Sequence, residues 1–464
     1  SLAGLTEDTS IAGGTGSNTL AFNKPGESGG WDNESYNAVN FNLSTDLGNA
    51  TDFQNIVGSN SNDILTGDSS ANIIIGGSGA DTLSGGDGND EIYGDYHTSD
   101  TGGATYGYRQ YGVSEGADIL YGGAGNDVLV GNNGDDQFDG GTGADTIATG
   151  SGSDTIVLRV GDGGSELSDA DIITDFTDGS DVLGLDNGLL YTEITRTQGT
   201  GDYSNDTIIK VGSEYLAILQ GVNVNNINYY DFASTATGNQ SLTGDVNDNV
   251  LLGASGIDTV TTGAGTDIVI TYGGDDVITV DGSGNKTIDG GTGTNTLTIN
   301  YAGVTGLSDF SVGAVSTSDG SNWTLTASNS DVITFKNIID YTYTSGAAGY
   351  WDGYVTAASK TYRFVSDMRN DKTPFSGAYG SVQAFVNETG STVEVVLSEG
   401  GKWLPQYRMS SYKDFSFDGS ETFKIYGSSG SEVMFGGYQA DTIIAGDGND
   451  FIFGGDGADT ITAG

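Results

Sequence analysis

The chain has 464 residues, of which 78 are glycine and 3 are proline, so we expect many tight turns without the proline content of collagen. Lys and Arg total 15 against 63 Asp and Glu; the formal net charge of −48 excludes nucleic acids and anionic membranes as favourable partners and leaves cations, although a solvated acidic surface or disorder would also carry such a charge. With no cysteine, neither disulfides nor thiolate metal sites can hold the chain together.

Residues 1–57 are expected to form a β flank or cap. The segments V-N-F-N-L-S-T from Val39 and F-Q-N-I-V-G-S from Phe53 read as its strands. The sequence starts at Ser1 without a hydrophobic signal segment and stops at Gly464 inside a repeat, so we expect a fragment or a processed product. No apolar run approaches the ~18 residues that cross a bilayer, so no membrane insertion is predicted.

Residues 58–161 repeat with a period of nine residues. Asp or Asn holds the same place in each copy: Asp63, Asn72, Asp81 and Asp90, then, after an insertion, Asp118, Asp127, Asp136, Asp145 and Asp154. The clearest copies read G-G-S-G-A-D-T-L-S from Gly76, G-G-D-G-N-D-E-I-Y from Gly85, G-G-A-G-N-D-V-L-V from Gly122 and G-G-T-G-A-D-T-I-A from Gly140. Incidental aspartates in a glycine-rich loop do not explain a register kept over this many copies.

The residue types of the repeat suit a calcium site. Glycine reaches positive φ at little cost, so the first six residues can curl and aim carbonyl oxygens inward. The aspartate adds a charged oxygen, and a second turn stacked on the first can complete the 6 to 8 oxygen ligands that Ca²⁺ takes. Two nonapeptides make one coil, so residues 18 apart are predicted to stack, as in Asp63 over Asp81, Asp118 over Asp136 and Asp127 over Asp145.

The last three residues of each copy form a short strand with its middle side chain inside the roll. These inward residues are Leu83, Ile92, Leu129 and Ile147. The insertion at 95–115 carries His97, Arg109 and several tyrosines, and is either a contact loop or a tolerated surface loop. Residues 162–234, with I-I-T-D-F-T-D-G-S-D-V-L from Ile172 and Y-D-F from Tyr230, are predicted to cap the apolar end of the first roll.

A second, degenerate roll is predicted over residues 235–300. Asn249, Asp258, Asp267 and Asp276 keep the nine-residue spacing, Lys286 follows at ten and Asn295 at nine. Lysine cannot coordinate Ca²⁺, so the later turns are expected to lack an ion or to use the ammonium group in its place.

Residues 301–424 differ in composition and form an aromatic-rich β domain in our interpretation. They hold nine of the 15 basic residues and three of the four tryptophans, and the alternation in T-V-E-V-V-L from Thr392 predicts antiparallel strands. The basic character marks either a face that meets an acidic neighbour or a domain without calcium. A third, incomplete roll over 425–464 places Glu432, Asp441, Asp450 and Asp459 in register.

The repeats match the G-G-x-G-x-D-x-U-x pattern and the chain resembles the RTX (repeat-in-toxin) proteins. The strands from Val39 and Phe53 look like those that lead into many RTX rolls, and the segment from Ile172 is similar to the end of serralysin-type rolls. The resemblance implies right-handed parallel β-rolls, calcium-dependent folding and type I secretion. The fold class is therefore predicted to be all-β, with several right-handed parallel β-rolls interleaved with antiparallel β domains. The candidate ligands of multiple Ca²⁺ ions are Asp63, Asp81, Asp90, Asp118, Asp127, Asp136, Asp145, Asp154, Asp258, Asp267, Asp276, Asp441, Asp450 and Asp459.

No catalytic constellation is recognised, and the chain is predicted not to be an enzyme. His97 is the only histidine, which disfavours a zinc protease motif and a Ser/His/Asp triad. G-E-S-G-G from Gly26 fits a nucleophile elbow by its letters alone, because no helical pattern follows it. Paired carboxylates belong to the repeats, where metal would occupy them.

Three functions remain open for an extracellular or cell-surface bacterial protein. The first is a self-assembling structural component, since rolls interleaved with β domains resemble surface-layer proteins and extracellular filaments, with a homo-oligomeric lattice or filament as the partner. The second is an RTX adhesin that binds a surface or glycan through residues 301–424. The third is the non-catalytic part of a secreted enzyme. In all three, calcium outside the cell is the expected folding switch.

Overall fold

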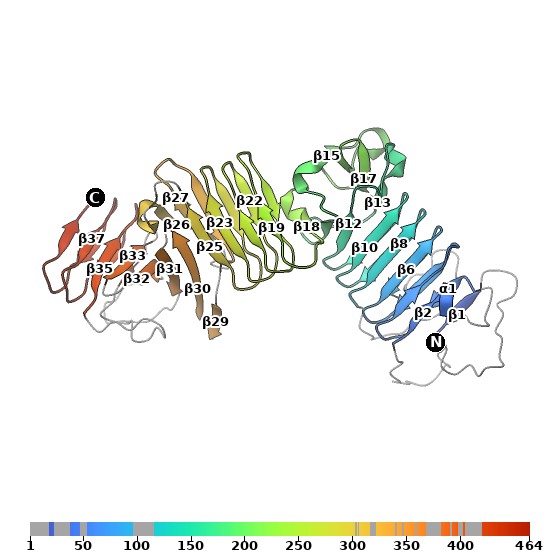
Figure 1. The fold of residues 1–464 in the computed structure, drawn as a ribbon, viewed down its shortest axis with the longest axis horizontal. Coiled ribbons are helices and arrows are strands. Elements are labelled where there is room, and N and C mark those ends of the chain that lie inside the picture. Colours follow the sequence, from blue (N-terminus) through green and yellow to red (C-terminus); the bar gives the residue numbers. More distant parts are fainter. Residues whose placement is uncertain are drawn as a thin grey trace. The chain divides into compact units, whose positions relative to one another are not determined.

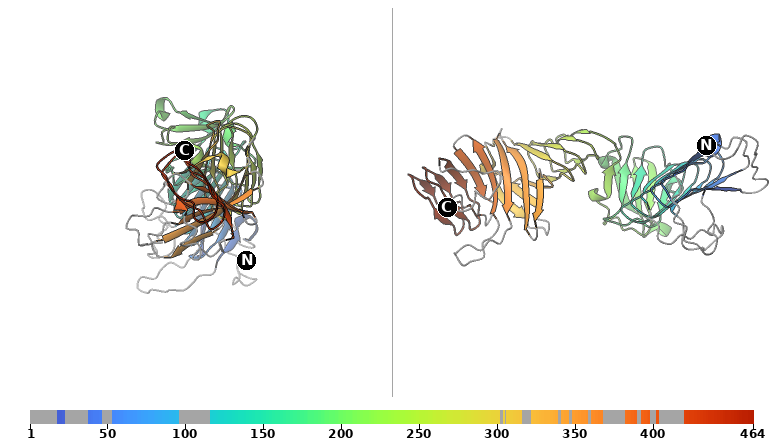
Figure 2. Two further views of the ribbon diagram at one scale, coloured as in Figure 1. Left: turned by 90° about the vertical axis from the view of Figure 1, so that its left-hand side faces the viewer. Right: turned by 90° about the horizontal axis from the view of Figure 1, so that it is seen from below.

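The computed structural model describes most of the chain, in segments 18–22, 38–46, 53–95, 116–301, 304, 306–315, 322–338, 341–345, 348–357, 360–367, 382–389, 392–397, 402–403 and 420–464. The chain divides into two compact units, Ser1–Thr235 and Ala236–Gly464, and each is described by itself. In both units short strands stack along parallel sheets (Figures 1 and 2). The finer segment boundaries that the sequence predicts stay predictions.

In the first unit each nonapeptide contributes one short strand, and successive strands alternate between two sheets. The first sheet contains, in spatial order, β1 (Thr19–Ala21), β3 (Asn55–Val57), β5 (Ile73–Gly77), β7 (Glu91–Asp95), β9 (Val128–Asn133), β11 (Thr146–Ser151), β13 (Asp171–Ile173), β17 (Glu214–Leu219), β16 (Thr207–Val211) and β15 (Ile194–Gln198). The second contains β18 (Phe232–Ser234), β14 (Val182–Leu185), β12 (Thr155–Leu158), β10 (Gln137–Thr142), β8 (Ile119–Ala124), β6 (Thr82–Asp87), β4 (Ile64–Thr66) and β2 (Asn40–Asn42). This alternation is a parallel β-roll.

The strand register confirms the predicted stacking. Leu129 lies opposite Ile147, 18 residues on, in the parallel pair β9 and β11. Leu83 pairs with Leu65 on one side and with Leu120 on the other, so the register resumes across the insertion. The predicted inward residues Leu83, Ile92, Leu129 and Ile147 are all 0% exposed. Each such side chain stabilises the folded roll by about 1.5–3 kcal/mol relative to an exposed position.

The C-terminal end of the first roll is covered by the segment that the sequence predicts as a cap. The strands β15, β16 and β17 form an antiparallel ribbon that extends the first sheet from β13. Ile209, Leu219 and Phe232 are 0% exposed there. The apolar cross-section of the last coil is thereby removed from water, as a solenoid end requires.

The second unit contains one large sheet and two smaller ones. The large sheet contains β19 (Ser241–Thr243), β21 (Thr259–Thr261), β23 (Val277–Asp281), β25 (Thr296–Asn300), β30 (Ala348–Ala357), β31 (Lys360–Asp367), β32 (Val382–Thr389), β33 (Thr392–Leu397), β35 (Thr422–Tyr426), β37 (Thr442–Ile444) and β39 (Thr460–Thr462), with β29 (Tyr341–Ser345) beside β30. The others contain β20 (Val250–Leu252), β22 (Asp267–Ile270), β24 (Lys286–Asp289), β28 (Val332–Lys336), β27 (Asn322–Thr326) and β26 (Ser311–Val315), and β34 (Lys402–Trp403), β36 (Val433–Phe435) and β38 (Phe451–Phe453).

The antiparallel strands expected within 301–424 join the second and third repeat regions through one sheet. Strand β25 pairs in parallel with β30, β30 to β33 are antiparallel to one another, and β33 pairs in parallel with β35. Val396 of β33 belongs to the same buried cluster as Leu297 of β25, and Val395 packs with Ile425 of β35. Hydrogen bonding is therefore continuous between the two repeat regions.

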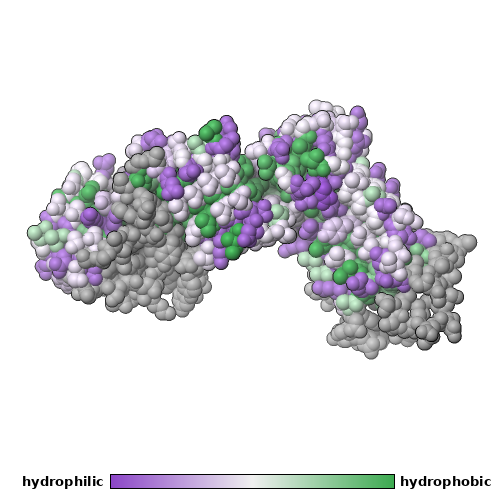
Figure 3. Space-filling model, in the orientation of Figure 1, coloured by the Kyte–Doolittle hydropathy of each residue, from purple (hydrophilic) through white to green (hydrophobic). Residues whose placement is uncertain are grey.

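Helices are short in the described part of the chain: α1 (Leu43–Asp46) and the 3₁₀ turns η1 (Leu167–Asp169), η2 (Tyr191–Glu193), η3 (Gly201–Tyr203), η4 (Tyr229–Asp231) and η5 (Leu307–Asp309). Among the residues described, no helix has the length and apolar character to cross a bilayer. On the face drawn in Figure 3, apolar residues form scattered patches among polar ones.

Candidate metal sites

The glycines of each turn serve two different purposes. In the turn from Gly122 to Asp127, Gly123 and Gly125 have φ of 111° and 140°, a region that residues with a side chain rarely adopt. Gly122 is needed for space, because a Cβ at this position would overlap both Oδ2 of Asp127 and the carbonyl oxygen of Gly140 in the next coil. The first glycine thus lets a carboxylate oxygen and a carbonyl oxygen of successive coils approach one backbone position.

The repeat aspartates form ladders along the two edges of the first roll. Oδ1 of each aspartate accepts a hydrogen bond from the backbone N–H of the equivalent residue one coil earlier. The N–H of Asp127 donates to Asp145 at 2.7 Å, and the N–H of Asp118 donates to Asp136 at 2.8 Å. The same bond joins Asp63 to Asp81, Asn72 to Asp90, Asp81 to Asp118, Asp90 to Asp127 and Asp136 to Asp154. The structure therefore brings together the pairs that the sequence predicted to stack.

In these ladders the second carboxylate oxygen, Oδ2, has no hydrogen-bond donor in most of the aspartates. Within the described residues, Oδ2 is buried and accepts no hydrogen bond in Asp81, Asp90, Asp118, Asp127, Asp136, Asp145 and Asp154. A buried acceptor without a partner costs about 1–3 kcal/mol, and more when the group is charged. Seven such oxygens in regular array require a partner that the protein's own side chains and N–H groups do not supply.

Burial disfavours the ionised form of these carboxylates unless a cation lies beside them. Loss of solvation, followed by the charges of neighbouring aspartates, raises the pKa of Asp81 to about 9. The same cause, burial first, raises the pKa of Asp118 to about 8 and that of Asp145 to about 7. The hydrogen bonds from the preceding coil oppose the shift and do not overcome it.

The donor set fits a hard cation held largely by backbone oxygens. Within the described part of the chain, no group of three Asp, Glu or His side chains is placed to hold a metal ion. A site here must therefore combine a carboxylate oxygen with carbonyl oxygens of stacked turns. Ca²⁺ accepts such mixed oxygen sets in flexible geometry, whereas Mg²⁺ demands a tight octahedron.

Other predicted ligands have a protein donor on the second oxygen. Oδ2 of Asp63 accepts the N–H of Ser59, Oδ2 of Asp258 accepts the N–H of Ala254 at 2.7 Å, and Oδ2 of Asp441 accepts the N–H of Gly437. Asp267 contacts Lys286 instead. Asp276, Asp450 and Asp459 keep the ladder bond, accepting the N–H groups of Asp258, Glu432 and Asp441. Oδ2 of Asp276 is the exception in this group, since it is buried without a hydrogen-bond partner among the described residues. The predicted ligands thus fall into environments that differ in their need for a cation.

Two members of the ladders were missed by the sequence reasoning. Oδ1 of Asp171 accepts the N–H of Asp145 at 2.9 Å, and Oδ1 of Asp181 accepts the N–H of Asp154 at 3.2 Å. Burial raises the pKa of Asp171 well above its usual range. The available signal was the tail of the repeat, present as A-D-I-I and S-D-V-L without the glycine turn. Residues 96–115, including His97, lie outside the described residues.

The comparisons with known proteins agree with this geometry. The family described as RTX calcium-binding nonapeptide repeat (4 copies) matches residues 57–92, 113–147, 130–163, 243–278 and 426–461. None of the curated proteins compared with the chain matches it.

Among solved structures 34 chains match. One is the extracellular lipase LipA from Serratia marcescens, at 19% identity and a TM-score of 0.19, over 40% of this chain and 41% of the lipase chain. The chain thus spans less than half the length of this lipase.

Proposed function

Because this chain is an RTX repeat protein that binds calcium and is of a secreted type, we propose that calcium ions between its stacked turns hold the first roll together. We also propose that the protein serves as a non-catalytic structural component at the bacterial cell surface. The observation that supports the calcium role most directly is the row of seven buried Oδ2 atoms without a protein donor. An ion beside these oxygens would neutralise the charge that burial disfavours.

Calcium then acts as a folding switch. Without calcium, as in the cytosol, the stacked aspartates repel one another and lose their solvation, which favours an extended chain that can be exported. Outside the cell, where modules of this kind bind with Kd of ~10⁻⁴–10⁻³ M, ions bind and the coils close on one another. Binding and folding are one equilibrium because the site exists only when two turns are stacked.

The proposed structural role is supported by the burial of the repeat carboxylates and by the stacking of the repeat strands. The repeat carboxylates are buried in ladders, and the strands stack into sheets that run through successive repeats, an arrangement that suits load-bearing assembly. Electron microscopy of negatively stained protein, with calcium and with chelator, tests the proposal. Ordered lattices or fibres that appear only with calcium are expected, and persistent monomers at high concentration with calcium would contradict self-assembly.

An adhesin is a second candidate, favoured by the concentration of basic and aromatic residues within 301–424 of so acidic a chain. Binding of the calcium-loaded monomer to a glycan array or to cells, lost when residues of this segment are changed, would support it over assembly. A catalytic motif in the flanking gene sequence would instead favour the non-catalytic region of a secreted enzyme.

A further inference from the structure

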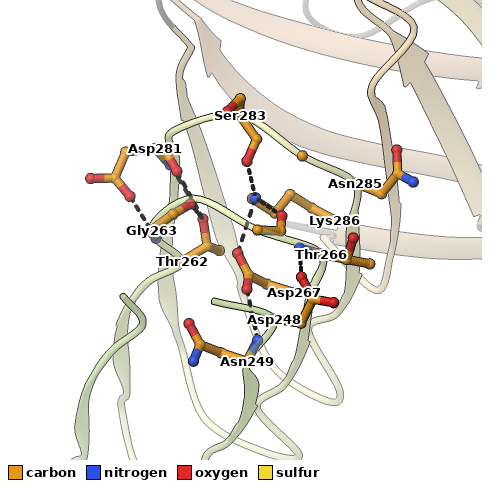
Figure 4. Close-up of polar contacts among 12 residues, drawn as sticks. Asp248, Asn249, Thr262, Gly263, Thr266, Asp267, Asp281, Ser283, Asn285 and Lys286 are labelled. Atoms are coloured by element: carbon orange, nitrogen blue, oxygen red, sulfur yellow. Dashed lines mark hydrogen bonds and ion pairs between the residues drawn. The ribbon is translucent and has the colours of Figure 1, made fainter. Parts of the chain in front are cut away.

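We propose that Lys286 is a built-in substitute for a calcium ion: its ammonium group takes the place of the metal between the turn of residues 262–267 and the turn of residues 281–286 (Figure 4). Lys286 lies in the second repeat region. The proposal rests on the proposed function only in that the calcium ladder of the first roll is the arrangement with which this region is compared.

The surroundings of the ammonium group are those of a coordinated cation. Nζ of Lys286 lies 3.0 Å from Oδ2 of Asp267, and both side chains are 0% exposed. Nζ also donates to the carbonyl oxygen of Gly265 at 2.6 Å and to that of Ser283 at 3.0 Å. Two carbonyl oxygens from successive coils thus accept N–H groups of the ammonium, and one carboxylate forms an ion pair with it. Figure 4 shows the three oxygens converging on Nζ.

The turn itself departs from the repeat pattern at two positions. It reads D-G-S-G-N-K, with Asp281 in the place of the first glycine and Lys286 in the place of the aspartate. Glycine at the first position is needed in turns such as that of Gly122, where a Cβ would overlap Oδ2 of Asp127. Other turns carry a side chain at this position before an aspartate, as Thr262 does before Asp267. Oδ1 of Asp281 accepts the N–H of Gly263 at 2.8 Å.

The carboxylate ladder ends at this lysine. Oδ1 of Asp267 still accepts the N–H of Asn249 at 2.9 Å, like the ladder aspartates of the first roll. The N–H of Asp267 donates to the carbonyl oxygen of Asn285 at 2.9 Å, since Lys286 offers no carboxylate. Strand β24, which begins at Lys286, then pairs in parallel with β28. The substitution therefore stands where glycine-rich coils give way to the antiparallel hairpin of β26 to β28.

A second residue closes the other edge of the roll without metal. Oδ1 of Asn295 accepts the N–H of Asp276 at 2.9 Å, which preserves the ladder bond. Nδ2 of Asn295 donates to the carbonyl oxygens of Gly290 at 2.5 Å and Asn337 at 3.0 Å. The neutral amide of Asn295, in the place of a repeat carboxylate, thus donates N–H groups to carbonyl oxygens. At Lys286 and Asn295 the end of the second roll therefore uses protein donors in place of a metal ion, whereas Oδ2 of Asp276, one coil earlier, is buried without a hydrogen-bond partner among the described residues.

Hydrogen exchange measured by mass spectrometry on the full chain tests this without any substitution. In chelator, peptides covering 262–289 are expected to keep their protection while peptides covering 118–154 exchange freely. Equal loss of protection in both regions would overturn the role of Lys286 as a cation substitute. Protection of both regions in chelator would contradict the calcium ladder of the proposed function and leave the lysine site intact, so the two failures are distinguishable.

The variant Lys286→Met removes the charge and retains the length of the side chain. Peptides covering 281–289 are expected to lose protection in chelator by at least tenfold in exchange rate. Lys336→Met is the matched control, because Lys336 pairs with Asp289 at 2.7 Å while its side chain is 33% exposed, and it should leave the exchange rate of 281–289 within a factor of three. Equal effects of the two variants would contradict the proposal.

The double variant Asp281→Gly with Lys286→Asp restores the repeat and should create a metal site. Native mass spectrometry of the calcium-loaded chain is expected to count at least one more Ca²⁺ than in the unchanged protein. An unchanged count in a folded double variant would show that this position is not equivalent to a calcium site.

Discussion

Asp127 and Asp145 are 18 residues apart and are joined by a hydrogen bond of 2.7 Å from the N–H of the first to Oδ1 of the second. Oδ2 of each has no donor among the described residues. Each carboxylate therefore uses one oxygen to fix the spacing of the coils and offers the other to a cation. The two tasks can be separated by substitution.

Asp127→Asn should separate charge from coil spacing. The amide oxygen can still accept the N–H of Asp90, which now donates to Oδ1 at 2.7 Å, while the charged oxygen is lost. Asp127→Ala removes both and is expected to cost about 1–3 kcal/mol more, because the N–H of Asp90 is left buried without an acceptor. Calcium titration followed by circular dichroism should show weaker, less cooperative folding for both variants.

The matched control for that pair is Asp87→Asn. Asp87 lies exposed in an equivalent glycine turn, outside the ladder. Loss of the Asp87 charge should leave the calcium concentration at the folding midpoint within twofold of that of the unchanged protein. Midpoints that shift equally for Asp87→Asn and Asp127→Asn would attribute the effect to net charge instead of ligation.

Gly122→Ala is expected to destabilise the first roll through overlap with Asp127 Oδ2 and the Gly140 carbonyl. Overpacking of this kind typically costs about 1–3 kcal/mol. Gly273→Ala is the control, because a Cβ there meets only Oγ1 of Thr292 as a close neighbour, at 3.1 Å. Thermal unfolding in calcium should show a lower Tm for Gly122→Ala than for Gly273→Ala, and the reverse order would contradict the packing argument.

The stability of the first roll should depend on pH with opposite sign in the absence and in the presence of calcium. In the metal-free roll, burial raises the pKa of Asp81 to about 9, above the ~3.9 of the unfolded chain. A carboxyl group with a raised folded pKa contributes stability that is present below ~3.9 and is lost as pH rises through the folded value. In chelator, residual structure of the first roll should therefore increase as pH falls from about 9 towards 4.

With calcium bound the same carboxylates are held as anions, so their pKa values lie below the unfolded value and acid removes the stability by displacing the ion. Raising the calcium concentration should move the acid transition to lower pH. Circular dichroism across pH in the two conditions checks both slopes. Slopes of the same sign with and without calcium would mean that the ladder carboxylates are not ligands.

Metal selectivity follows from the donor set. Because carbonyl oxygens of two coils must share the ion with a carboxylate, the site suits Ca²⁺ and not the tight octahedron of Mg²⁺. Titration of chelated protein with calcium should restore β circular dichroism cooperatively, and the same concentration of magnesium should not. Equal folding with both ions would contradict this assignment.

Much of the first roll could be predicted from the period of nine alone. The alternation of Leu83 and Ile92 between two sheets, and the stacking of Asp118 over Asp136, follow directly from that spacing. The environment of Asp63 was not predicted: its Oδ2 is satisfied by the backbone of Ser59, in a turn that reads G-S-N-S-N-D and lacks the second and fourth glycines of the repeat.

Where the period is lost, prediction failed for physical reasons. Asp171 and Asp181 enter the ladder through strand pairing without a glycine turn, so spacing could not identify them. The passage of one sheet from β25 through β30 and β33 into β35 depends on pairings between distant segments, which no local pattern encodes. Lysine at 286 was recognised as incompatible with calcium, but the three oxygens around its ammonium group come from two coils and are brought together only in the folded chain.

The step from Asp81 to Asp118 covers 37 residues of sequence, yet its hydrogen bond of 2.8 Å has the geometry of steps that cover 18. Additional sequence between Gly94 and Asp118 is thus compatible with the alignment of the hydrogen bonds on either side, and a longer connection adds little closure entropy. This point in the chain is a natural grafting position. New recognition segments could be acquired there, by evolution or by an engineer, without redesign of the scaffold that displays them.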